Sequence, residues 1–291
     1  IKALANESRI NILQLLDRGC LNVNEIAETL DLPVSTTALN IKILEEAGLV
    51  LTELQPGIRG SMKVSSKACS NIIINLNDSI NTLSESCVYI NMPIGNYSDC
   101  LVLPSCGLVS ENGSIGQFDK PSSFYYPEKV NSQLLWFYKG YREYKFPYEK
   151  LKNKNINMLE VSIEMCSEAP HYKNDWPSDI TMWINGIEVG TWTSPGDFGG
   201  RRGRNNPQWW PDTINQYGLL KYWRIKDTGT YIDDVKLSER TINDFNIEDN
   251  DFISVKIGIK ENAKNIGGIS IFGKSFGDYP QDIIMKIEYT K

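Results

Sequence analysis

The chain has 291 residues, of which 41% are hydrophobic and 23% are charged, and its formal net charge is −6. This composition excludes a disordered protein, and the length is enough for about two domains. No stretch reaches the roughly 18 apolar residues of a membrane helix, and no signal segment opens the sequence, so we expect a soluble, cytoplasmic protein without a membrane partner.

Cysteine and histidine are scarce, which limits the chemistry. The six cysteines include no CxxC pair and are too sparse for a disulfide scaffold. We expect them to be reduced, although the spacing leaves open whether Cys100 and Cys106 ever pair. His171 is the single histidine, and no GxSxG or P-loop motif is present. We therefore predict no metal, no cofactor and no catalytic residue.

Aromatic residues divide the chain into two parts. The nine Phe, seven Trp and fourteen Tyr residues all lie at or after Tyr89. A segment without aromatics is best filled by helices, whereas Gly, Pro and aromatics together are typical of β-rich folds. We predict an α+β multidomain protein with a DNA-binding domain over 1–66, a linker or dimerisation helix over 67–88 and an antiparallel β-sandwich over 89–291.

Three helices are predicted in the first part. Asn6 caps a helix with apolar residues at Ile12, Leu13 and Leu16, since apolar residues three and four apart share one helical face. Asn22 opens a second helix, which buries Val23, Ile26, Ala27 and Leu30. After a turn at Asp31–Pro33, a third helix runs from about Ser35 to Ala47 and buries Ala38, Ile41 and Leu44.

A β-hairpin follows the third helix. Its strands are 49–55 and 61–65, joined by the turn at 56–60. Two helices, a short turn, a third helix and a hairpin are the element order of a winged helix-turn-helix.

Residues 1–66 resemble the ArsR-type winged-helix regulators. The resemblance is carried by Ala3-Leu4-Ala5 followed by Arg9, and by Leu44-Glu45-Glu46-Ala47-Gly48-Leu49-Val50. It implies double-stranded DNA as the partner. Members of that family sense metals through clustered cysteines, but Cys20 is alone here, which speaks against metal sensing.

The third helix is predicted to enter the major groove with its N-terminal end. The predicted base contacts are Val34, Ser35, Thr36, Thr37 and Asn40, of which Asn40 suits adenine. The predicted phosphate contacts are Lys42 on this helix, and Arg59 and Lys63 on the hairpin. Residues 1–66 hold six basic and eight acidic residues, so we expect weak binding by a single copy.

An apolar stripe follows the hairpin at Ile72, Leu76, Ile80 and Leu83. We interpret it as the dimerisation surface of a homodimer, which would bind a palindromic operator with two copies. Packing of this stripe against the protein's own second domain is the alternative.

The second part alternates apolar and polar residues in several segments. These are 158–166, 254–260 and 283–289, together with a hairpin over 180–192 around Asn185-Gly186. Spaced strands with polar outer faces predict an antiparallel sandwich that is jelly-roll-like.

A long loop rich in Gly, Arg, Asn and Trp follows this hairpin, and loops of this length are often functional. Indole faces stack on sugars, and Asp, Asn and Arg bond hydroxyl groups. We therefore predict a small-molecule effector, most simply a carbohydrate, whose site comprises Trp176, Asp197, Arg201, Arg202, Arg204, Asn205, Trp209 and Trp210.

Other interpretations of this loop remain. The tryptophans could fill the core, Arg201–Arg204 could enter a DNA minor groove, or the β-rich part could be a protein-interaction module. Asp175, Asp179, Glu188 and Asp197 could in principle supply a carboxylate pair for glycoside hydrolysis, but no spacing selects two of them.

Overall fold

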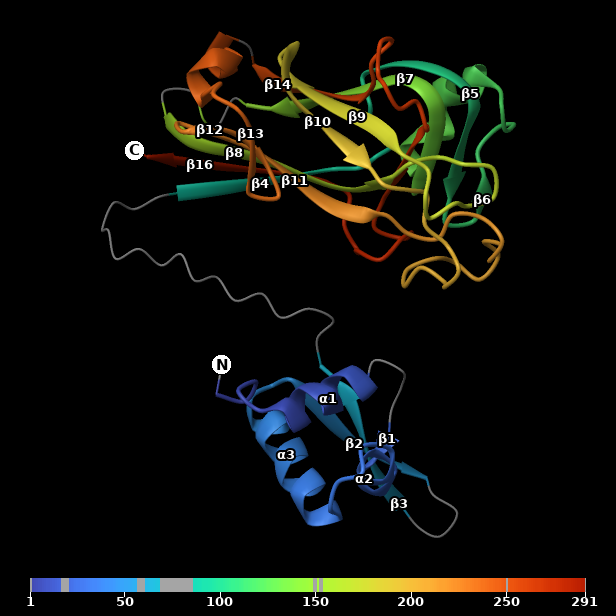
Figure 1. Cartoon of the computed structure of the whole chain (residues 1–291), viewed down its shortest axis with the longest axis vertical. Coiled ribbons are helices and arrows are strands. Elements are labelled where there is room, and N and C mark those ends of the chain that lie inside the picture. The colour runs from blue at the N-terminus through green and yellow to red at the C-terminus, as the bar shows by residue number, and fades with distance from the viewer. Residues whose placement is uncertain are drawn as a thin grey trace. The chain divides into compact units, whose positions relative to one another are not determined.

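The chain forms two compact units, residues 1–81 and 82–291, in a computed structural model (Figure 1). The structure describes residues 2–16, 21–56, 61–68, 86–148, 151, 154–249 and 251–290. The division falls within the predicted 67–88 segment. The predicted dimerisation residues Ile72, Leu76, Ile80 and Leu83 lie outside the described residues, as does Arg59.

The first unit, called the helical unit below, has three helices and a small sheet. Its elements are α1 (Glu7–Leu15), β1 (Leu21–Asn22), α2 (Val23–Thr29), α3 (Val34–Glu46), β2 (Val50–Pro56) and β3 (Ser61–Lys67). The strands pair in the order β1-β3-β2, all antiparallel. The predicted three helices and hairpin are confirmed.

Both predicted caps are present. The Asn6 side chain accepts the backbone N–H of Arg9 at 3.2 Å. Asn22 accepts the N–H groups of Asn24 and Glu25, while the Glu25 carboxylate accepts the N–H of Asn22, which completes a capping box. These bonds satisfy amide donors that a helix start leaves unpaired.

The turn between α2 and α3 is set by a left-handed residue. Asp31 has φ of +51°, and the N–H of Leu32 bonds back to the carbonyl of Ala27 at 2.9 Å. This is the Schellman arrangement that ends a helix and redirects the chain within two residues. Pro33 then precedes the first residue of α3.

The buried face of α3 differs from the prediction. Thr37, Asn40, Ile41 and Leu44 are buried, whereas Ala38 is exposed. The predicted burial of Ala38 was wrong because the helix is turned so that two polar residues face the interior. Leu44 and Ile41 pack there with Ile12, Leu13 and Ile26.

The second unit, called the β-rich unit, is an antiparallel sheet with short 3-10 turns. Its strands are β4 (Ser86–Met92), β5 (Asp99–Ser110), β6 (Gly113–Ser114), β7 (Leu134–Pro147), β8 (Asn155–Cys166), β9 (Ser178–Ile184), β10 (Ile187–Ser194), β11 (Leu219–Lys226), β12 (Gly229–Ile232), β13 (Val235–Ser238), β14 (Phe252–Ile259), β15 (Ile269–Phe272) and β16 (Ile283–Thr290). The four predicted strand regions are confirmed as β8, β9–β10, β14 and β16.

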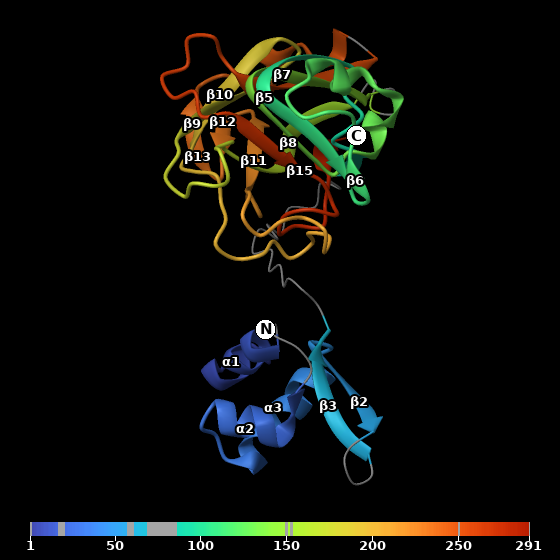
Figure 2. The same cartoon turned by 90° about the vertical axis from the view of Figure 1, so that its right-hand side faces the viewer.

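The strands form one curved sheet in the order β10-β9-β14-β7-β15-β8-β11-β12-β13. Further strands join it at the side, since β5 pairs with β7 and β16 pairs with both β8 and β4. The two ends of the main path approach each other, because the Thr230 hydroxyl of β12 donates to the Val189 carbonyl of β10 at 3.1 Å. The sheet is therefore nearly closed (Figure 2). An antiparallel β-rich domain is confirmed, while the jelly-roll sandwich stays a prediction.

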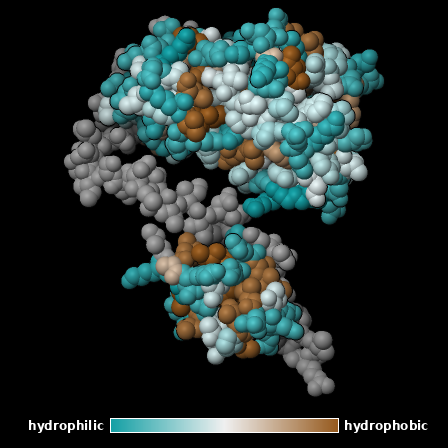
Figure 3. Space-filling view, in the orientation of Figure 1, coloured by the Kyte–Doolittle hydropathy of each residue, from teal (hydrophilic) through white to brown (hydrophobic). Residues whose placement is uncertain are grey.

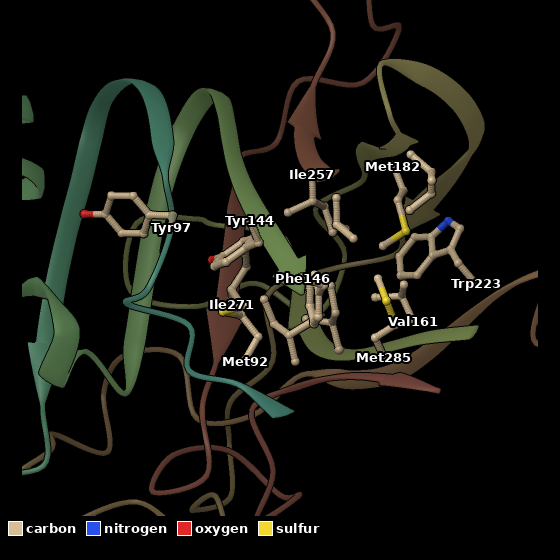
Figure 4. Packing of buried hydrophobic residues seen from close by; sticks show 14 of the residues in the cluster. Met92, Tyr97, Tyr144, Phe146, Val161, Met182, Trp223, Ile257, Ile271 and Met285 are labelled. Atoms are coloured by element: carbon tan, nitrogen blue, oxygen red, sulfur yellow. The ribbon is translucent and has the colours of Figure 1, made fainter. Parts of the chain in front are cut away.

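The interior of this sheet is apolar. Inward residues of β8, β14 and β16, such as Val161, Ile257 and Met285, pack with Trp223 and Phe146 (Figure 4). A second cluster holds Trp210, Phe272 and Phe276 beneath the long loop. Cys100, Cys106 and Cys166 are buried free thiols.

Candidate functional sites

The exposed face of α3 is the first candidate site. Ser35, Leu39 and Lys42 are spaced four and three residues apart and therefore share one helical face. Leu39 is 59% exposed and Val34 is 51% exposed, and Ser35 and Thr36 are exposed beside them. The face thus offers hydroxyl and apolar groups at the start of the helix.

Two predicted base contacts are turned away from this face. Thr37 is buried and its hydroxyl donates to the Pro33 carbonyl at 3.1 Å. Asn40 is buried, and its side-chain oxygen accepts from Nη1 of Arg9 at 3.3 Å. Both side chains are committed to the domain interior, so we no longer assign them to base contacts. Leu39 lies on the exposed face but was not among the predicted base contacts, because an apolar side chain gives no sequence signal for base recognition.

The predicted phosphate contacts that the structure describes are accessible. Lys42 lies 3.9 Å from Glu46 and Lys63 lies 3.7 Å from Glu45, and both lysine side chains are largely exposed. Exposed ion pairs contribute about 0–1 kcal/mol, so a phosphate can replace either carboxylate partner. The Lys63–Glu45 pair also joins the hairpin to the helix.

The long loop after β10 is the second candidate site. Several of its side chains form hydrogen bonds to other residues of the same loop. Arg202 donates to the Trp210 carbonyl at 3.0 Å and also bonds Pro207 and Asp212. The Trp210 indole N–H donates to the Asn215 carbonyl at 2.8 Å. Polar groups that were predicted to bind a ligand therefore hold the loop together.

Asp197 and Trp210 are enclosed rather than exposed, which corrects their assignment as surface ligand contacts. Asp197 accepts the Ala169 N–H at 2.9 Å, and burial raises the pKa of its carboxyl to about 7 against the effect of that bond. Trp210 packs on Phe276, with ring centroids 5.3 Å apart. Trp210 therefore fits the alternative interpretation, in which the tryptophans of the loop fill the core.

The other predicted ligand residues lie in this loop, except Trp176, which precedes β9. Arg201 pairs with Asp278 and lies over the Tyr217 ring at 3.6 Å, and the Trp176 indole donates to the Glu168 carbonyl. Arg204 is exposed and Asn205 is half-buried. Trp209 is 41% exposed, with its N–H on the Glu111 carbonyl at 2.6 Å.

A hollow of about 360 Å³ lies elsewhere, on the outer face of β5, β7, β9 and β14. Its lining includes Leu101, Leu103, Lys139, Tyr141, Trp183 and Lys256, and none of the predicted ligand residues. Sequence alternation had placed Lys256 on an outer face, but it could not show which outer residues surround a hollow.

Exposed apolar surface alone does not select a site, because hydrophobic patches are scattered over the visible face of both units (Figure 3). Within the described part of the chain, no three His, Cys, Asp or Glu side chains are arranged to hold a metal ion. Nor is any described helix both long and apolar enough to cross a membrane.

Comparison with known proteins bears on the helical unit. Residues 4–53 match the family model of a helix-turn-helix domain, which spans α1, α2 and α3 and enters β2. No curated protein matches the chain. The chain therefore carries an N-terminal helix-turn-helix domain, followed by a large antiparallel β-rich unit.

Proposed function

We propose that this protein is an ArsR-type, cytoplasmic transcriptional regulator without catalytic activity. The single observation that carries the proposal is the exposed face of α3, which lies in a domain that matches the helix-turn-helix family. Val34, Ser35, Thr36 and Leu39 read base edges, and Lys42 and Lys63 contact phosphates. Arg59 keeps its proposed role on the hairpin.

The proposed regulator acts as a homodimer on a palindromic operator. Residues 1–66 have a net charge of −2 from six basic and eight acidic residues, so one copy gains little from phosphate contacts. Two copies that read two half-sites about one DNA turn apart would supply the missing affinity.

The β-rich unit, a jelly-roll-like sandwich in this proposal, binds a small-molecule effector of carbohydrate type. Effector binding changes operator affinity by stabilising one of two arrangements of the dimer. A protein-interaction module is the second candidate, because Phe118 and Trp209 expose large aromatic surfaces on this unit.

The test begins with selection of preferred duplexes from random DNA, followed by affinity measurements by fluorescence anisotropy. The double variant Ser35→Ala, Thr36→Ala should lose about 1–3 kcal/mol of discrimination between selected and random DNA for each base contact removed. Lys42→Gln should weaken the affinity for selected and random DNA alike. It should also lower the slope of log affinity against log salt concentration by about one.

Gln14→Ala is the matched control, because Gln14 is exposed on α1. It should leave both affinities unchanged. Unaltered discrimination in the α3 double variant would refute the assignment of this face as the DNA-reading surface.

A further inference from the structure

The hollow on the β-rich unit is built from neighbouring strands in a fixed register. Trp183 of β9 lies opposite Lys256 of β14, Tyr141 of β7 lies opposite Leu101 of β5, and Lys139 lies opposite Leu103. Gly258 is the partner of Tyr141 on β14 and has no side chain to fill the space between Lys256 and Lys260. The register therefore leaves room between aromatic and basic side chains.

One residue of the lining is a glycine that the backbone requires. Gly140, which lines the hollow, has φ of +118°, and a Cβ there would lie 1.9 Å from the Leu101 carbonyl oxygen. Any larger residue would strain the backbone and push β7 away from β5. Gly140 therefore allows β5 and β7 to lie close together beside the hollow.

The apolar part of the lining is exposed. Leu101 and Leu103 are 54% and 47% exposed, which is unusual for two leucines on one strand. The Tyr141 hydroxyl donates to Asp99 at 2.8 Å, a bond that favours one orientation of the ring. Aromatic faces beside apolar side chains suit the flat face of a ring compound.

The charged part of the lining favours an anion. Lys139 and Lys256 form no ion pair with any residue in the described part of the chain. The Lys256 ammonium lies 4.5 Å from the Tyr141 ring centroid, and Lys139 donates to the Glu261 carbonyl at 3.2 Å.

Four carboxylates lie in or beside the lining. Asp99 accepts the Tyr141 hydroxyl at 2.8 Å. Glu188 pairs with Lys260 at 2.9 Å, and Glu143, opposite Lys256, accepts a bond from the Ser254 hydroxyl at 2.7 Å. Glu261 belongs to the lining itself. None of these carboxylates forms a salt bridge with Lys139 or Lys256 in the described part of the chain, so both lysines remain available to an anion.

We infer that this hollow binds a small ring compound carrying a carboxylate, either an acidic sugar or an aromatic acid. The ring lies against Trp183 and Tyr141, and the carboxylate bonds Lys256. This inference rests on the proposed function, because it names the chemical class of the effector and moves its site from the long loop to the sheet. A volume of about 360 Å³ is at the lower end for small-molecule sites.

The experiment is calorimetric titration of the full chain with four probes. Glucuronate and benzoate carry both a ring and a carboxylate, glucose lacks the charge, and inorganic phosphate lacks the ring. We expect glucuronate or benzoate to bind at least ten-fold tighter than glucose and phosphate. Which of the two binds identifies the source of the ring. Equal binding of all four probes, or binding of none, would overturn the inference.

Variants locate the site. Lys256→Gln should lower the affinity for the acid at least ten-fold, and Trp183→Leu should lower this affinity as well. Lys145→Gln is the matched control, because Lys145 lies on β7 with its ammonium 4.6 Å from the Phe252 ring but does not line the hollow. Loss of binding in Trp209→Ala but not in Lys256→Gln would place the site in the loop and refute this inference.

DNA binding separates this inference from the proposed function. If the acid binds the hollow but leaves the affinity for selected DNA unchanged, the site stands and the effector role fails. If no acid binds while selected DNA is still recognised, the site fails and the DNA-binding role stands. If DNA is not bound under any condition, the proposed function fails independently of the calorimetric result.

Discussion

Arg142 of β7 is a charged residue fully enclosed in the β-rich unit. Its guanidinium carbon lies 4.0 Å from the Phe124 ring centroid and 4.5 Å from that of Tyr97, and its Nη1 donates to the Tyr141 carbonyl. Burial lowers the pKa of Arg142, and the ring faces replace part of its lost hydration. Residue type alone would place an arginine outside, so only the register of β7 reveals its position.

Glu164 at the end of β8 is a buried carboxylate that joins two loops. It accepts the backbone N–H groups of Gly218, Asp278 and Tyr279 at 2.8–2.9 Å. Burial raises the pKa of Glu164 to about 7, although the three amide donors favour its charged form. The loops before β11 and before β16 are therefore held by one titratable group.

This raised pKa predicts a pH dependence of stability. Between pH about 4.5 and 7 the folded state binds more protons than the unfolded state, so the free energy of unfolding falls as pH rises. For Glu164 the fall is up to about 3 kcal/mol, at about 1.4 kcal/mol for each pH unit of pKa difference. Glu164→Gln should reduce this fall without removing it, because burial also raises the pKa of Asp197 to about 7. Urea unfolding across the pH range measures the change.

Glu160→Gln is a suitable control, because Glu160 lies on the same strand and pairs with Arg224 near the surface. It should retain the slope between pH 5 and 7. A Glu164→Gln protein with the same slope as the unaltered chain would show that Glu164 ionises normally.

The helices illustrate what a sequence pattern can and cannot predict at the scale of an element. The caps at Asn6 and Asn22 were predicted because capping bonds involve residues only two or three positions apart. The prediction of which residues α3 buries was partly wrong, because packing placed Thr37 and Asn40 inside. Arg9 makes this possible, since its guanidinium bonds both Asn40 and the Ala3 carbonyl.

The loop after β10 leads to a prediction about its adjacent tryptophans. Trp210→Ala should lower the free energy of unfolding by about 3–5 kcal/mol, the usual effect of removing a buried aromatic side chain. Trp209→Ala should cost less, about 2 kcal/mol, because Trp209 is 41% exposed although its ring also contacts Trp210 and Phe276. Urea unfolding of the two variants measures the difference. Equal losses would mean that both side chains contribute equally to the core.

At the scale of the whole molecule, the two units have separate cores. The helical unit is built around Ile12, Ile26 and Leu44, and the β-rich unit around a different and larger cluster that includes Val161 and Ile257. The cores also differ in composition, since aromatic side chains occur only in the second.

Separate cores predict two thermal transitions in calorimetry. Leu44→Ala should lower only the transition of the helical unit, and Ile257→Ala only that of the β-rich unit, because both side chains are fully buried in their own clusters. Each substitution should cost about 2–5 kcal/mol. A single transition that both variants shift equally would show that the units unfold together.

The sequence by itself determined the division into two units, the order of the three helices and hairpin, and four strand regions of the β-rich unit. These features depend on composition, on apolar spacing and on caps and turns such as Asn185-Gly186, all of which act between neighbours along the chain.

Only the tertiary structure decided which of the predicted site residues are exposed. Asn40, Asp197 and Trp210 have the residue types of binding sites, yet each is enclosed by segments distant in sequence. Conversely, the hollow between Trp183, Tyr141 and Lys256 requires the pairing of β9, β14 and β7. Strand pairing across many residues depends on how the whole sheet curves and closes, and a local sequence pattern does not contain that information.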